Sequence, residues 1–132
     1  MNIEVFYIIV LKYTNSMTTD SKNQKSLINN KCVPCEKVGK PMSREEAQDY
    51  VDESYHWTLS PDAKKISKEY KFQDFIGAIN FVDRVADVAE EEGHHPDIHI
   101  HYNIVTLELW THSIGGLSVN DFILAAKIDA MQ

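Results

Sequence analysis

Two neighbouring runs of alternating residues stand in the last third of the chain. Residues 97–103 (DIHIHYN) and 105–110 (VTLELW) each place aliphatic or aromatic side chains at every second position, with mainly polar residues between them. A period of two is typical of a half-buried β-strand. Because the two runs follow each other closely, we predict that they form an antiparallel hairpin.

The aliphatic faces of the two runs set the expected register, because directly opposed residues lie on the same side of an antiparallel pair. Pairing Ile98 with Leu109 leaves a tight turn at residues 103–104. The same register places His95 opposite His112. A shift of two residues would keep the faces and still leave the two imidazoles near each other.

A different period precedes this hairpin. Between Asp74, the expected N-cap, and Gly93, apolar residues recur at steps of three and four, which predicts a long helix. The expected core face comprises Phe75, Ile79, Val82, Ala86 and Ala89. Pro96 cannot continue the helix, so the chain must turn at the histidines between Gly93 and Pro96.

The remaining patterns complete one layer of strands and one of helices. Two strand-like runs, 55–59 and 66–72, are joined by a Pro-Asp turn. Capping patterns open a short helix at Ser43 and a last helix at Ser118. We therefore predict an α+β fold, a two-layer sandwich with a four-stranded antiparallel sheet in ββαββα order and helices packed on one face.

The start of the chain is expected to lie outside this fold. Residues 17–31 are rich in Ser, Asn and Lys, and such a stretch buries too little apolar surface to order itself. Residues 5–11 (VFYIIVL) are too short for a membrane span and lack signal-peptide flanks. We predict a disordered or loosely ordered extension over residues 1–30 and a single domain over residues 31–132, in a cytoplasmic protein without a membrane partner.

Composition narrows the functional classes. The chain has 132 residues, 43% of them hydrophobic, which suits one compact core. Its formal net charge of -7 argues against a protein that tracks nucleic-acid phosphates. Cys32 and Cys35 have the spacing of a redox pair or half of a zinc site, and ordinary reduced thiols are the simpler interpretation.

Five of the six histidines lie between Glu90 and His112. Three of them, His94, His95 and His112, are expected to converge, and imidazoles can divide the roles of general acid and general base near neutral pH. Metal ligation is the rival interpretation, although the HExxH spacing is absent. Glu90 stands four residues before His94, where it either orients that imidazole or is a solvated acidic residue.

The spacing around these histidines resembles that of the pterin-4a-carbinolamine dehydratases. The family signature combines an acidic residue, His-His-Pro, an aromatic residue, a third histidine and an aspartate. Its matches here are Glu90, His94, His95, Pro96, Tyr102, His112 and Asp121. The resemblance extends over roughly residues 32–130 through the segments FQDF and THSIGGLSVNDF.

This resemblance implies dehydration of 4a-hydroxytetrahydropterin to quinonoid dihydropterin, in the recycling of tetrahydrobiopterin. It assigns acid/base roles to His94 and His112, and to His95 a pterin contact that shares in proton transfer. The residues expected to bind or orient the substrate are Glu90, Pro96, Asp97, Trp110 and Asp121. The pterin is the substrate, so no cofactor and no metal are expected.

The resemblance also implies a homo-oligomer, either a dimer or a tetramer. Animal members additionally bind a homeodomain transcription factor, so a non-catalytic dimerisation or coactivator-type binding module is the alternative function. A hydrolase with a histidine-bound metal is the third possibility.

Overall fold

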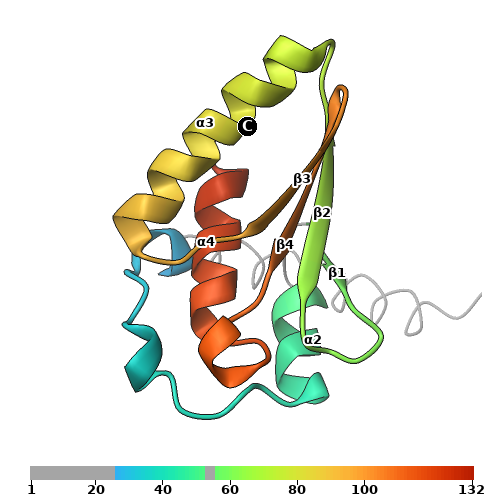
Figure 1. Ribbon diagram of the computed structural model, residues 1–132. Coiled ribbons are helices and arrows are strands. Elements are labelled where there is room, and N and C mark those ends of the chain that lie inside the picture. Colours follow the sequence, from blue (N-terminus) through green and yellow to red (C-terminus); the bar gives the residue numbers. More distant parts are fainter. Residues whose placement is uncertain (1–25, 53–55) are drawn as a thin grey trace, which may run out of the picture.

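The computed structural model describes residues 26–52 and 56–132. Its elements are the 3-10 helix η1 (Cys35–Lys37), α2 (Arg44–Asp52), β1 (Thr58–Leu59), β2 (Ile66–Lys71), α3 (Phe75–Glu92), β3 (Asp97–His101), β4 (Ile104–Leu109), the 3-10 helix η2 (His112–Ile114) and α4 (Val119–Asp129). The four strands form one antiparallel sheet in the order β1-β2-β4-β3. The long helices α3 and α4 lie side by side against it (Figure 1). The predicted α+β class and ββαββα order are confirmed.

The core lies between the sheet and the helices. Ile66, Val105, Leu107 and Leu109 on the central strands are fully buried and form one cluster with residues of α3 and α4. Helix α2 closes one end of this cluster, where the ring of Tyr50 stacks on a phenylalanine of α4 at 4.5 Å between centroids. The central strands β2 and β4 are therefore fixed by packing against the helices, and this packing also positions the chain where it leaves the strands.

The predicted register of the second hairpin is wrong by two residues. Ile98 pairs with Leu107, not with Leu109, and the turn lies at Tyr102 and Asn103. Tyr102 adopts a left-handed conformation with φ 54°. Both registers keep the same side chains on the same face, so alternation alone cannot distinguish them.

The predicted core face of α3 is only partly correct: Ala89 is buried and Val82 packs against the core, but the centre of the buried face lies elsewhere. The buried residues are Ala78, Phe81, Val85, Ala89 and Glu92, whereas Phe75 is 47% exposed and Ala86 is exposed. The predicted and the observed sets of residues both recur at steps of three and four, so helical periodicity alone fits either set. Packing decides between them, because the ring of Phe81 lies 4.6 Å from that of Tyr70 on β2.

The predicted helix caps are confirmed. Asp74 accepts a hydrogen bond from the Gly77 amide at 2.8 Å. Ser43 opens α2, since its amide donates to the Glu46 carboxylate at 2.7 Å. Ser118 opens α4 in a complete capping box. In the first hairpin, β1 is shorter than the predicted run 55–59, whose first residue lies outside the described ranges.

One residue ahead of the predicted domain contacts the core. Residues 26–29 are helical, and Leu27 is 7% exposed and belongs to the core cluster. The segment just before the predicted boundary at residue 30 therefore packs on the core through Leu27. Residues 1–25 lie outside the described residues. Among the helices of the described ranges, none combines the length and apolar character needed to cross a membrane.

A carboxylate at the end of α4 ties this helix to the first hairpin. Asp129 accepts hydrogen bonds from Trp57 Nε1 at 3.0 Å, Lys68 Nζ at 2.7 Å and the Tyr70 hydroxyl at 3.0 Å. Burial, followed by the charge of Asp129, raises the pKa of Tyr70. The hydroxyl of Tyr70 therefore stays protonated and acts as a donor.

We expect Asp129→Ala to lower the free energy of unfolding by about 2 kcal/mol, because it leaves the buried Trp57 and Tyr70 donors without their acceptor. Denaturant titration followed by tryptophan fluorescence measures the change. The control is Asp87→Ala on the exposed side of α3, with an expected change below about 0.5 kcal/mol. Equal losses in the two variants would contradict the role given to Asp129.

Candidate active site

The first two histidines of the site are placed by the end of α3. Gly93 adopts a left-handed conformation with φ 64°, which a glycine tolerates without strain. The His94 amide still donates to the Ala89 carbonyl at 3.1 Å, and Pro96 then directs the chain into β3. The imidazoles of His94 and His95 therefore project from a rigid junction between helix and sheet.

The imidazole of His94 is buried and held by a carboxylate. Its Nε2 lies 2.6 Å from Asp121 Oδ1, and the two side chains are 5% and 0% exposed. The other carboxylate oxygen, Oδ2, accepts from the Thr111 hydroxyl and the Ser118 amide, both at 2.9 Å. With two donors already on Oδ2, the carboxylate acts as the acceptor for His94 Nε2–H as well. This arrangement leaves Nδ1 of His94 as the free basic nitrogen.

The imidazole of His95 is exposed and pairs with the preceding helix. Its Nε2 lies 2.6 Å from Glu90 Oε1, and both side chains are more than half exposed. Of the two alternatives for Glu90, the structure does not show the bond to His94; the carboxylate is exposed and pairs with His95. The left-handed turn at Gly93 carries His94 inward toward α4 and leaves His95 on the side of Glu90.

The third histidine follows the end of β4, which lies beside the start of β3. His112 begins η2, and its Nε2 lies 3.7 Å from Asp97 Oδ1. Its ring meets the indole of Trp110 edge-on at 4.2 Å between centroids. Trp110 Nε1 donates to Asp97 Oδ2 at 2.8 Å, so a single carboxylate on β3 is bonded to the indole and lies near the imidazole. Lys65 Nζ lies over the indole of Trp110, 5.0 Å from the ring centroid.

These side chains surround one cavity of about 90 Å³. It is lined by Cys35, Gly93, His94, His95, Trp110 and His112. The three predicted catalytic histidines and Trp110 are thus brought together, in spite of the register error. Glu90, Asp97 and Asp121 do not line the cavity, but each is hydrogen-bonded to a side chain that does. Pro96 is not among the lining residues.

Three residues of this region were not anticipated from the sequence. Cys35 lines the cavity, and Glu92 and Asn120 are buried polar residues behind it. Burial opposes ionisation of Glu92, but hydrogen bonds from Lys127 and the Cys32 amide hold its pKa below the usual value. Glu92 stands last in a run of three glutamates, and the only available signal was the unfavourable position of that run at a helix C-terminus.

Metal ligands are not grouped in the described part of the chain. Among those residues, no cluster of three or more His, Cys, Asp and Glu side chains is arranged to hold a metal ion. Cys32 and Cys35 are free thiols. The described histidines His56, His99 and His101 are exposed, and none of them is among the residues that line the cavity.

Comparison with known proteins places these residues in a family. The family model described as Pterin 4 alpha carbinolamine dehydratase matches residues 40–131. A relative from Halorhodospira halophila that bears this family's name is 46% identical over 106 residues, 80% of this chain and 97% of the relative. Pterin-4-alpha-carbinolamine dehydratase 2, mitochondrial, from Arabidopsis thaliana is 39% identical over 140 residues, 91% of this chain and 75% of the relative.

Solved structures agree with this assignment. A transcriptional coactivator/pterin dehydratase from Brucella melitensis superimposes with a TM-score of 0.65 at 29% identity, over 70% of this chain and 98% of that one. A pterin dehydratase-like protein described as a RuBisCO assembly factor shares the fold with a TM-score of 0.50 at 24% identity, over 58% of this chain and 89% of that one.

Proposed function

Because the chain belongs to the pterin-4a-carbinolamine dehydratase family, we propose that it is a hydro-lyase that converts 4a-hydroxytetrahydropterin into quinonoid dihydropterin and water. The reaction serves the recycling of tetrahydrobiopterin after a hydroxylase has used it. The observation that carries the proposal is the convergence of His94, His95 and His112 on one cavity, each with a carboxylate oxygen within 3.7 Å of its Nε2.

The reaction needs one proton donor and one proton acceptor. Loss of the 4a-hydroxyl requires an acid at the departing oxygen, and formation of the C=N bond requires a base for the proton on the ring nitrogen. His94 suits the base, because Asp121 fixes its Nε2–H and leaves Nδ1 free. His112, more than half exposed, with its Nε2 3.7 Å from Asp97 Oδ1, is assigned the role of the acid.

The remaining side chains are suited to binding. The cavity of about 90 Å³ accommodates only part of a ligand, so the rest of the pterin must lie across its open mouth. Trp110 offers an aromatic surface there, fixed by its bond to Asp97. His95, held by Glu90, lies within reach of the same ligand and can share in proton transfer.

The experiment that tests this function generates 4a-hydroxytetrahydropterin with a hydroxylase and follows its decay by ultraviolet absorbance. The proposal predicts faster decay when the protein is present, with a rate proportional to its concentration. The alternative, a non-catalytic dimerisation or coactivator-type module, predicts no acceleration. This alternative is supported by the description of the Brucella melitensis structure, which joins both roles.

We expect the activity to be independent of metal, because an acid/base pair of imidazoles is sufficient for dehydration. Dialysis against a chelator should leave the rate unchanged, and addition of zinc should not increase it. The matched control is the same protein carried through dialysis without chelator. A loss that zinc restores would instead favour the third possibility, a hydrolase-type metal site at these histidines.

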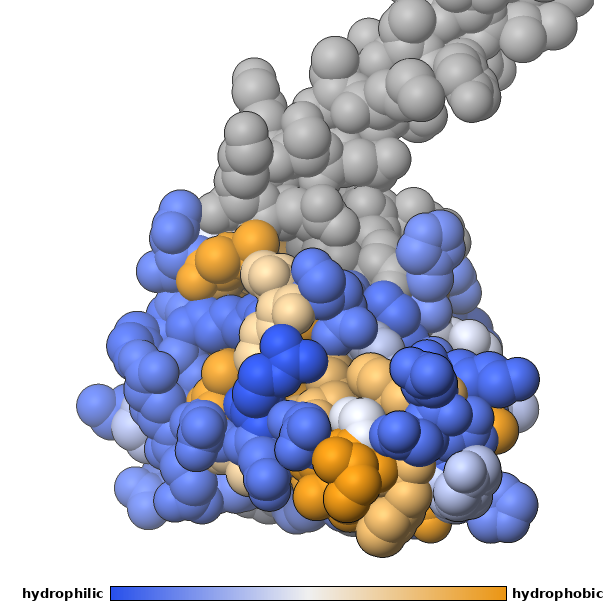
Figure 2. Space-filling model, turned by 90° about the horizontal axis from the view of Figure 1, so that it is seen from above, coloured by the Kyte–Doolittle hydropathy of each residue, from blue (hydrophilic) through white to orange (hydrophobic). Residues whose placement is uncertain are grey.

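We also propose a homo-oligomer with a two-fold contact. Strand β3 is a sheet edge with an exposed Ile100, and exposed edges can pair with another chain. Figure 2 looks down on the end with the start of α3 and the β3–β4 turn, and shows apolar side chains there among hydrophilic ones. The exposed apolar residues of this end include Phe75, Ile76 and Tyr102.

Light scattering at micromolar concentration should therefore find a dimer or tetramer and no dominant species near the chain mass of 15.1 kDa. The control is a second concentration ten times lower, since a specific assembly dissociates only near its Kd. A monomer at both concentrations would contradict the proposal. A cytoplasmic location remains a prediction, and one relative is named mitochondrial.

A further inference from the structure

A short segment ahead of the matched family region forms part of the cavity wall. We call residues 31–38 the strap; the family model begins only at residue 40. The strap passes the end of α3 and the start of α4 before η1. Its Cys35 lines the same cavity as the three histidines.

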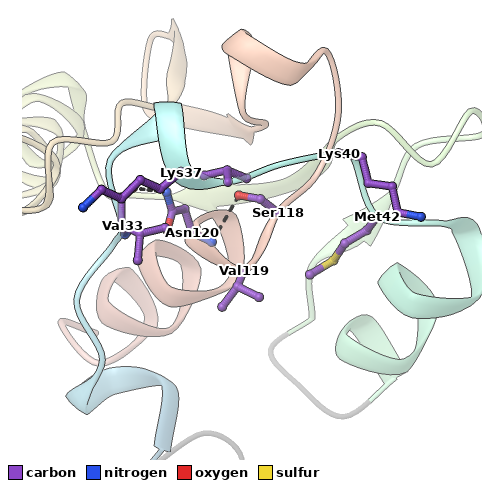
Figure 3. Close-up of a pocket in the computed structure, with 8 residues that line it drawn as sticks. Val33, Lys37, Lys40, Met42, Ser118, Val119 and Asn120 are labelled. Carbon is purple, nitrogen blue, oxygen red and sulfur yellow. Dashed lines mark hydrogen bonds between the residues drawn. The ribbon is translucent and has the colours of Figure 1, made fainter.

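Two buried polar side chains fix the backbone of the strap. The Asn120 side chain accepts from the Val33 amide at 2.9 Å and donates to the Val33 carbonyl at 2.7 Å (Figure 3). Glu92 accepts from the Cys32 amide at 2.9 Å. Asn120 is 2% and Glu92 8% exposed. Without the strap these contacts would be lost, and buried polar groups rarely stay unpaired. The strap is therefore a fixed part of the fold.

The anchoring gives the two cysteines different environments. Cys32 lies against α4, with its Sγ 3.6 Å from the Asn120 carbonyl, and burial raises its pKa to about 12. Cys35 begins η1 three residues later and faces the histidine cavity. Lys37, in the same turn, lines a separate cavity of about 200 Å³ together with Val119 (Figure 3).

We propose that the strap is a wall of the substrate pocket and that Cys35 contacts the bound pterin and limits the size of the ligand that the cavity admits. This inference rests on the proposed function. A thiol is small and only weakly polar, so it borders an aromatic ring without competing for the protons that the histidines transfer. A larger side chain at this position would occupy the cavity itself.

The first test places the same side chain, that of phenylalanine, at two positions of one turn. Cys35→Phe should raise the KM for the carbinolamine by about 10-fold or more with a smaller change in kcat, because it removes binding space and leaves the acid/base groups in place. Lys37→Phe, which faces the other cavity, should leave both constants near the wild-type values. Equal effects of the two substitutions, or none from Cys35→Phe in an active enzyme, would overturn the proposal.

The second test does not require turnover. Iodoacetamide alkylation of Cys35 is followed by mass spectrometry with and without 7,8-dihydrobiopterin, a stable relative of the product. At a ligand concentration ~10 times its Kd, alkylation should slow by about 10-fold, since only the free fraction reacts. Cys32 is the internal control, because its raised pKa keeps it slow in both samples.

The two tests separate failure of this inference from failure of the proposed function. An active dehydratase whose Cys35 is not protected would overturn the role of the strap and leave the dehydratase function standing. Protection of Cys35 in a protein without dehydratase activity would support the strap as a pterin-binding wall and contradict the proposed reaction. Absence of both activity and protection would overturn both.

Discussion

His94→Ala and His112→Ala should each lower the dehydration rate by about 10²-fold or more, the usual effect of removing a general acid or base. In the proposed mechanism His94 uses Nδ1 as the base, since Asp121 lies 2.6 Å from Nε2. The same mechanism assigns the acid to His112, whose Nε2 lies 3.7 Å from Asp97 Oδ1. Stopped-flow absorbance of the carbinolamine measures both variants, and circular dichroism checks that each is folded.

The matched control is His99→Ala. His99 lies on β3 close to the site in sequence, but it is exposed, pairs with Glu108 at 3.1 Å and is not among the residues that line the cavity. Its rate should stay near that of the wild type. If His99→Ala lost as much activity as His94→Ala, the assignment of roles to the cavity histidines would be wrong.

Asp121 should affect activity and stability in different ways depending on the substitution. Asp121→Asn keeps the shape and one acceptor oxygen for the Ser118 amide, but it presents an amide where His94 Nε2 now finds an acceptor. The imidazole would then adopt the opposite tautomer or rotate. We expect a fall in rate of about 10²-fold or more, as in other carboxylate–histidine pairs.

Asp121→Ala removes the capping interaction as well. It leaves the Thr111 hydroxyl, the Ser118 amide and His94 without their buried acceptor, so the free energy of unfolding should fall by about 3 kcal/mol. Asp121→Asn should lose clearly less stability than Asp121→Ala. Denaturant titrations and rate measurements on the same preparations test the pair. Full activity in Asp121→Asn would show that the carboxylate serves only the helix cap.

The local patterns of the sequence predicted those features that depend on near neighbours. Capping boxes at Ser43 and Ser118 involve residues three positions apart, and both form as expected. The alternation of residues 97–103 and 105–110 correctly indicated a hairpin. Likewise, Gly93 and Pro96 correctly marked the junction from which the paired histidines project.

Features that depend on which of two equivalent patterns packs better were not predictable. A two-residue shift of the hairpin keeps every side chain on its face, and α3 carries two rows with the same periodicity. Contacts between the rings of Phe81 and Tyr70 settle the rotation of α3. Such contacts join residues distant in sequence, and alternation or periodicity within one element does not encode them.

The partners of buried polar residues were missed for the same reason. Asp121 combines a local cap with a bond to His94, 27 residues earlier, and only the cap has a sequence signal apart from the family resemblance. Asn120 holds Val33 across 87 residues. For Glu90 the sequence left open a bond to His94 or a solvated carboxylate, and after the left-handed turn at Gly93 it is His95 that pairs with Glu90.

The most direct test of the account measures the decay of enzymatically generated 4a-hydroxytetrahydropterin with equal concentrations of the wild-type protein and of the His94→Ala/His112→Ala double variant. The account predicts a concentration-dependent acceleration by the wild type and a rate with the double variant that is close to the uncatalysed decay. Decay that the wild type leaves unchanged, or that both proteins accelerate equally, would contradict dehydration by the histidines of this cavity.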